Sequence, residues 1–150
     1  QGLLDELLTN ALFNAPTDER GRRRFAAQSR TTEVSLAGAE RVEVELASDA
    51  ERIGVCVTDP FGSLDPLRTQ DALAQCLRRE GAPSMDRSGG AGLGLYHLLE
   101  GASHFAIHLQ PGVRTRCAAL VDLQGPFRVF GARSRSFNLF AARGALRSAA

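Results

Sequence analysis

The chain contains no lysine, and this absence excludes several common ways of handling phosphates and amines. All 18 of its basic residues are arginine. A P-loop needs a lysine on the phosphates, a protein kinase fold needs a lysine on a strand, and Schiff-base catalysis needs an amine. If the protein binds phosphate, the charge must therefore be met by arginine, backbone amides or a bound metal ion.

Cysteine, net charge and long apolar runs are also scarce. The three cysteines, Cys56, Cys76 and Cys117, stand far apart, so no zinc site or redox pair is expected. A net charge of +1 gives no field that attracts nucleic acid. No apolar run is long enough to span a bilayer and no signal-peptide pattern is present. We expect a cytoplasmic protein without nucleic-acid partner or membrane insertion.

The 150 residues are enough for one globular domain, and 43% of them are hydrophobic. Apolar residues recur at helical spacing from Leu3 to Ala15, before Pro16. Residues 17–32 are polar and are expected to form a mobile connection. Asp65, as an N-cap, begins a short helix that reaches about Arg79, and a further helix is expected from Leu93 to about Leu99.

Strand patterns fill the rest of the first 125 residues. The expected strands are Glu33 to Leu36, Arg41 to Ala47, Arg52 to Thr58, His104 to Gln110 and Thr115 to Leu123. The strand from Arg41 to Ala47 alternates apolar and acidic residues, which predicts one buried face. The strand from Arg52 to Thr58 is apolar on both faces, which predicts a central position in the sheet. Turns are expected at residues 48–51 and at Pro111-Gly112. The element order lacks regular strand-helix alternation, so it favours an α+β fold. We expect a two-layer sandwich of a mixed, mainly antiparallel sheet covered on one face by helices.

The C-terminal segment has its own composition. After Asp122 there are five arginines and no acidic residue, interleaved with phenylalanines. We divide the chain into a domain at residues 1–125 and a basic, Phe-containing extension at residues 126–150. Phe127 to Phe130 has the pattern of an edge strand. The remainder is suited equally to docking on the domain or on a partner.

Polar residues with potential chemistry lie on the first helix. Glu6, Asn10 and Asn14 are spaced four apart, which places them along one edge of the helix. A solvated helix face explains the same pattern, so the stripe alone does not decide between a site and a surface.

Asp59 directly follows the buried strand pattern and precedes Pro60, Phe61 and Gly62. A carboxylate at a strand end is suited to accept a hydrogen bond from an adenine amino group. An Asp-Pro pair near a glycine is also common turn chemistry, and the two interpretations are equally favoured by this pattern.

A glycine-rich run from Gly89 to Leu95 leads directly into a predicted helix. Closely approaching amides and the positive helix end are suited to hold phosphate, and a flexible hinge is the competing interpretation. A Rossmann fold requires its glycines early, after a first strand. Here the run comes late in the chain, which argues against that fold.

Taken in order, these three segments resemble one family. Residues 6–15 resemble its N box, residues 59–62 its first glycine box, and residues 90–95 its second. The family is the Bergerat, or histidine-kinase-like, ATPase domain, and the resemblance covers roughly residues 3–123. In that family a strand and a helix precede the N box, and we expect them either to be missing from this protein or to lie outside this sequence.

The resemblance implies a role for each matching residue. Asn10 would coordinate Mg²⁺, Asp59 would bind the adenine amino group, Glu6 would be the general base, and Thr115 would support a water network beside adenine. Residues 63–89 would form an ATP lid. The remaining nucleotide-binding positions implied by the three boxes are Asn14, Gly62, Gly90, Gly92, Leu93, Gly94 and Leu95.

Glu6 and Asn14 make the N box most similar to that of anti-sigma-factor serine kinases. We therefore expect an ATP- and Mg²⁺-binding regulatory domain in bacterial signalling, with a regulatory protein partner and with ATP-dependent serine kinase or ATPase activity. Phe61 stands where the family's first glycine box carries glycine. The alternative is a degenerate module of the same fold that binds proteins without productive nucleotide binding. No histidine has the context of a phosphoacceptor.

Overall fold

The computed structural model describes residues 2–78, 91–124 and 134–142. Its helices are α1 (Leu3–Thr9), α2 (Pro66–Arg78) and α3 (Ala91–Gly101), with a π-helical turn η1 (Asn10–Asn14) and a short 3-10 turn η2 (Gly38–Glu40). Its strands are β1 (Glu43–Ser48), β2 (Arg52–Asp59), β3 (His104–Gln110), β4 (Arg114–Asp122) and β5 (Ser136–Ala141). Within these ranges, no helix has the length and apolarity that a membrane crossing requires.

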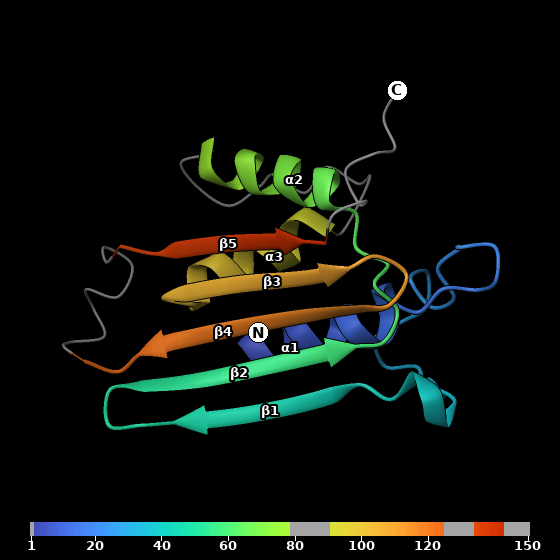
Figure 1. Ribbon diagram of the computed structural model, residues 1–150, viewed down its shortest axis with the longest axis horizontal. Coiled ribbons are helices and arrows are strands. Elements are labelled where there is room, and N and C mark those ends of the chain that lie inside the picture. The colour runs from blue at the N-terminus through green and yellow to red at the C-terminus, as the bar shows by residue number, and fades with distance from the viewer. Residues whose placement is uncertain (1, 79–90, 125–133, 143–150) are drawn as a thin grey trace.

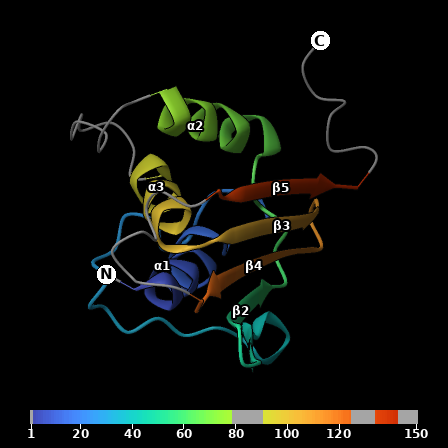
Figure 2. The same ribbon diagram turned by 90° about the vertical axis from the view of Figure 1, so that its left-hand side faces the viewer.

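The strands form one sheet in the order β1-β2-β4-β3-β5 (Figure 1). Every neighbouring pair is antiparallel except β3 and β5, which run parallel. Helices α1 and α3 lie on the same face of this sheet (Figure 2). The α+β class and the mixed, mainly antiparallel sheet predicted from the sequence are therefore confirmed.

The core lies between that sheet face and the two helices. It contains buried apolar side chains from every layer, namely Leu7, Ala11, Val57, Leu95, Leu98, Ala102, Phe105, Ile107 and Ala119. Leu7 and Phe105 are each only 2% exposed. Burial of one such side chain contributes about 1.5–3 kcal/mol. This packing fixes the N-terminal helix and α3 against β2, β3 and β4.

Two local signals in the sequence form the structures that they predict. The Asp49 carboxylate accepts bonds from the N–H groups of Glu51 and Arg52, which closes the β1–β2 hairpin. The Asp65 carboxylate accepts bonds from the N–H groups of Leu67 and Arg68, which caps α2. Strand β2 has β1 on one side and β4 on the other, so its predicted central position is confirmed.

The prediction of a strand at Glu33 to Leu36 was wrong, because these residues pair with no described strand. The predicted buried face of β1 was also wrong. Val44 is 44% exposed and Leu46 is 70% exposed. Strand β1 is an edge of the described sheet, beyond α1, which lies behind β2 and β4 (Figure 1). Alternation shows which residues share a face, but it does not show whether that face is covered.

The segment at residues 17–32 was expected to be mobile, and the structure gives it defined contacts. A β-bridge joins Thr17 to Arg23, and the Arg24 N–H donates to the Pro16 carbonyl at 2.9 Å. The Arg24 side chain pairs with Glu40. The loop is therefore anchored at both its beginning and its middle.

The C-terminal extension contributes strand β5 to the same sheet. Phe137 pairs in register with Phe105 on β3, and their ring centroids are 5.7 Å apart. The sequence left open whether the extension docks on the domain or on a partner, and residues 136–141 dock on the domain. The strand pattern at Phe127 to Phe130 lies outside the described residues.

Candidate functional site

Asp59 ends strand β2, and Thr115 lies beside it on β4. The two residues are 6% and 3% exposed. The Asp59 carboxylate accepts bonds from the N–H groups of Phe61 at 3.0 Å and Gly62 at 3.4 Å, and also from Thr115. Burial nevertheless raises the pKa of Asp59 above its usual value, because removal from water disfavours the charged form. The turn interpretation of Asp59 is confirmed, and the same geometry leaves a carboxylate at the strand end.

Gly62 closes this corner at a position that only glycine can occupy. Its φ is 56°, and a Cβ there would lie 2.2 Å from the Gln110 carbonyl oxygen. The Gly62 carbonyl also accepts a bond from the Gly112 N–H at 3.0 Å. Gly62 therefore holds the loop after β2 against the turn between β3 and β4, and no side chain intervenes.

The predicted helix at residues 3–15 changes type at Asn10. Helix α1 continues into the π-helical turn η1, in which the Ala15 N–H donates to the Asn10 carbonyl at 2.8 Å. The Asn14 side-chain amide donates to the Asn10 Oδ1 at 2.8 Å. Both side chains are half-buried. Short π-helical turns inside α-helices occur often at functional sites, and here the turn joins two of the predicted binding residues.

Glu6 meets the glycine run. Its side chain is 8% exposed, and a Cβ added to Gly94 would lie 2.8 Å from the Glu6 Oε2. The missing side chain at Gly94 thus gives the carboxylate its space on the face of α3. Sequence reasoning assigned both residues to one site, but it did not predict this contact.

The glycine run is more helical than predicted, because α3 begins at Ala91 instead of Leu93. Gly92 and Leu93 therefore lie in the first turn, where backbone N–H groups have no partner within the helix. Such a helix start favours anions. Leu95 is 8% exposed and packs in the core, so its side chain anchors the helix. Gly90 lies outside the described residues, as do residues 79–89 of the predicted lid.

A hydrogen bond joins the Asp59 corner to the segment of residues 6–15. The Ser63 hydroxyl donates to the Ala15 carbonyl at 2.7 Å, so the loop that follows Asp59 is fixed to the end of η1. The structure therefore brings together Asp59, Gly62 and Thr115 as one group, and Asn10 and Asn14 as another, with Ser63 between them. Nothing in the sequence pattern had drawn attention to Ser63.

The described ranges contain no group of three or more His, Cys, Asp or Glu side chains placed to hold a metal ion. A Mg²⁺ ion bound with a nucleotide has a different requirement, because it keeps several waters and takes only one or two protein ligands besides the phosphates. The Asn10 Oδ1 accepts one hydrogen bond, from Asn14, and an amide oxygen has a second lone pair. Asn10 therefore fits the role of a single Mg²⁺ ligand.

Cys117 lies on β4, one strand from Asp59. Burial, with a smaller contribution from the nearby Asp59, raises the pKa of the Cys117 thiol to about 12. The thiol is therefore neutral at physiological pH, and Asp59 is the candidate group for chemistry at this end of β2.

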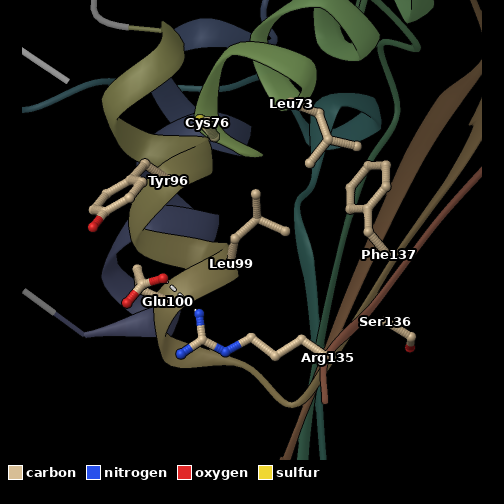
Figure 3. Close-up of a pocket in the computed structure, with 8 residues that line it drawn as sticks. All are labelled: Leu73, Cys76, Tyr96, Leu99, Glu100, Arg135, Ser136 and Phe137. Atoms are coloured by element: carbon tan, nitrogen blue, oxygen red, sulfur yellow. Dashed lines mark hydrogen bonds and ion pairs between the residues drawn. The ribbon is translucent and has the colours of Figure 1, made fainter. Parts of the chain in front are cut away.

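A separate cavity of about 320 Å³ lies between α2, α3 and the start of β5 (Figure 3). Leu73, Leu99 and Phe137 form its apolar wall, and the Arg135–Glu100 ion pair, with a nitrogen–oxygen distance of 2.5 Å, lies at one side. None of the predicted nucleotide-binding residues lines it. We place the candidate site at Asp59 and residues 6–15 because most of the predicted polar residues lie there and Ser63 links the two segments, whereas this cavity is mainly apolar.

Comparisons with models of known families, with curated proteins and with solved structures found no match to this chain.

Proposed function

We propose that this chain is an ATP- and Mg²⁺-binding regulatory domain of the Bergerat, histidine-kinase-like type, closest to the anti-sigma-factor serine kinases. The observation that carries the proposal is the buried Asp59 carboxylate beside Thr115, joined through Ser63 to the N-box helix. In this proposal Asp59 accepts a hydrogen bond from the adenine amino group. Thr115 supports a water on the same side of the base.

The phosphates are assigned to the opposite end of the site. Backbone amides in the first turn of α3, at Gly92 and Leu93, would bind phosphate oxygens, and Asn10 would be the protein ligand of Mg²⁺. The one-sided helical layer over a mixed sheet agrees with this fold type. A regulatory protein is the proposed partner.

Glu6 is assigned the role of general base. It is nearly buried beside Gly94, on the helical turn that precedes Asn10. From there a carboxylate would orient a water or a protein serine hydroxyl towards the terminal phosphate. The proposed activity is accordingly that of an ATPase or a protein serine kinase.

Nucleotide binding is tested first, by the melting temperature with and without Mg-ATP. A ligand that binds only the native state stabilises it by about 2.7 kcal/mol at 100 times its Kd. We expect Mg-ATP to raise the melting temperature of the wild type, and Asp59→Asn to remove most of that rise. The amide of asparagine presents an N–H group where the adenine amino group needs an acceptor.

Asp122→Asn is the matched control, because Asp122 lies on the same strand as Thr115 but at the other end, paired with Arg52. In Asp122→Asn, Mg-ATP should raise the melting temperature as much as in the wild type. A wild type whose melting temperature is unchanged by millimolar Mg-ATP would exclude the nucleotide-binding proposal.

Catalysis is tested separately, by phosphate release and by phosphorylation of a serine-containing partner. We expect Glu6→Gln to lower the rate about 10²-fold or more, the usual contribution of a positioned base. Binding of Mg-ATP should be retained. Equal rates in the two proteins would leave Glu6 with only a structural role beside Gly94.

The second candidate is a protein-interaction module of the same fold. The exposed Phe140, which is 52% exposed and packs on His108, favours it, as does the exposed Leu46 on the edge strand. Deletion of residues 126–150 is a poor test, because it would remove β5 and uncover β3. The two candidates are separated by the Mg-ATP titration, since this one predicts no binding.

A further inference from the structure

Arg30 lies against the N box although it belongs to none of the three boxes. Its guanidinium donates to the Asn14 Oδ1 at 3.3 Å, and its Cζ lies 4.9 Å from the centre of the Phe13 ring. Asn14 in turn donates to the Asn10 Oδ1 at 2.8 Å. A continuous chain of hydrogen bonds therefore leads from an arginine to the proposed Mg²⁺ ligand.

The loop that carries Arg30 is held in place by its own contacts. The Thr32 N–H donates to the Ser29 carbonyl at 3.0 Å, and the hydroxyls of Ser29 and Thr31 are 2.8 Å apart. Earlier in the loop, Arg24 is bonded to Pro16 and paired with Glu40. These contacts bring the loop back across the end of η1, and so place the guanidinium over Phe13.

The guanidinium has donors to spare. Arginine carries five N–H groups, and within the described residues the Arg30 side chain forms one hydrogen bond, to Asn14. Arg30 is also exposed, so its other N–H groups are accessible to a ligand. A planar guanidinium stacked on a ring is well suited to bind phosphate with two parallel hydrogen bonds.

The composition favours an arginine in this role, because the chain has no lysine to neutralise a polyphosphate. We infer that Arg30 is a phosphate-binding residue, which contacts the terminal phosphates of the nucleotide whose Mg²⁺ is held by Asn10. This inference rests on the proposed nucleotide-binding function. It adds the side-chain cation that the three boxes do not supply.

The test measures the affinities of ATP and adenosine by titration calorimetry, each with Mg²⁺ and with EDTA. The variants are Arg30→Gln and Arg30→Lys, and the control is Arg20→Gln, which removes the same charge from the exposed turn of the same loop. Circular dichroism and the melting temperature check that each variant is folded.

We expect Arg30→Gln to weaken ATP binding about tenfold or more, the usual loss for a hydrogen bond to a charged group, both with Mg²⁺ and with EDTA. Adenosine affinity should stay within about twofold of the wild type, because its site lies at Asp59. Arg30→Lys keeps the charge without the paired donors, and should fall between the wild type and Arg30→Gln. Arg20→Gln should match the wild type.

Three outcomes overturn the inference. If Arg30→Gln binds ATP as tightly as the wild type, Arg30 does not contact phosphate, although the proposed function stands. If the loss appears only with Mg²⁺, Arg30 acts through Asn14 and Asn10 and not on phosphate. If the wild type binds neither ATP nor adenosine, the proposed function fails and this inference fails with it. Should Arg30→Gln not fold, Arg30→Lys provides the same comparison.

Discussion

The two ends of the proposed site are built differently. At the adenine end, Asp59 and Thr115 are 6% and 3% exposed, and Gly62 packs its backbone directly against the β3–β4 turn. At the phosphate end, Asn10 and Asn14 are half-buried, Arg30 is exposed, and the bond that joins Arg30 to Asn14 is 3.3 Å long. The first end is set by backbone contacts before any ligand arrives. The second consists of side chains that a bound nucleotide would rearrange, so in the proposed function more of the binding energy would be spent on ordering them.

The largest expected effect lies at the closed end. Gly62→Ala would force a side chain into a left-handed backbone conformation and into the Gln110 carbonyl. Strain of this kind costs about 1–3 kcal/mol, and the overlap adds to it, so we expect a loss of about 3 kcal/mol or more. Urea unfolding followed by circular dichroism measures the change.

Gly21→Ala is its control, because Gly21 has a φ of 73° but no atom within 4 Å of the added Cβ. It should cost only about 1 kcal/mol, which is the backbone term alone. If the two substitutions cost the same, the adenine end is not held by close contact, and the contrast between the two ends disappears.

A smaller effect is expected in the pH dependence of stability. The pKa of Asp59 is raised by burial from its usual value of 3.8, so protonation stabilises the folded state. That contribution is fully present below pH 3.8 and is lost as the pH rises through the raised value. The variant Asp59→Asn has no such dependence, because an amide does not titrate in this range.

We therefore expect the stability of the wild type, relative to Asp59→Asn, to be highest in acid and to fall as the pH rises towards neutrality. The expected change is about 1.4 kcal/mol for each unit of pKa shift. Carboxylates with lowered pKa, such as those of Asp18 and Asp49, are common to both proteins and cancel in the difference. A difference in stability that does not vary with pH would contradict a desolvated Asp59.

The smallest effect is expected at the phosphate end. Asn14→Ala removes the bond to Asn10, and a half-exposed hydrogen bond contributes about 0.5–1 kcal/mol to stability. Asn138→Ala, on the exposed side of β5, is a matched control and should be nearly neutral. Thermal unfolding measures both. A loss at Asn14 comparable to that at Gly62 would show that the phosphate end is as rigid as the adenine end.

The features predicted correctly from the sequence depend on residues close together in the chain. The cap at Asp65 and the turn at Asp49 each use hydrogen bonds across two or three residues. The alternation of His104 to Gln110 likewise identifies β3 without knowledge of its neighbours. In the candidate site, the same is true of the Asp59 turn, since the Phe61 and Gly62 amides follow directly.

The features that were missed depend on distant segments. The contact of Glu6 with Gly94, the bond of Ser63 to Ala15 and the position of Arg30 each join parts of the chain that only the fold brings together. The parallel pairing of β5 with β3 is also long-range. A periodic pattern within one segment shows which residues share a face of that helix or strand. It does not show which distant segment packs against that face.

Strand β1 affects how the protein behaves in concentrated solution. Among the described strands it pairs with β2 alone, and its apolar Val44 and Leu46 are exposed. Glu43 gives the edge negative charge, a common protection against edge-to-edge association, whereas Glu45 pairs with Arg116. This repulsion is screened over about 10 Å at 0.1 M salt and over about 3 Å at 1 M salt. The colloidal stability of the protein is therefore expected to fall with ionic strength, independently of its folding stability.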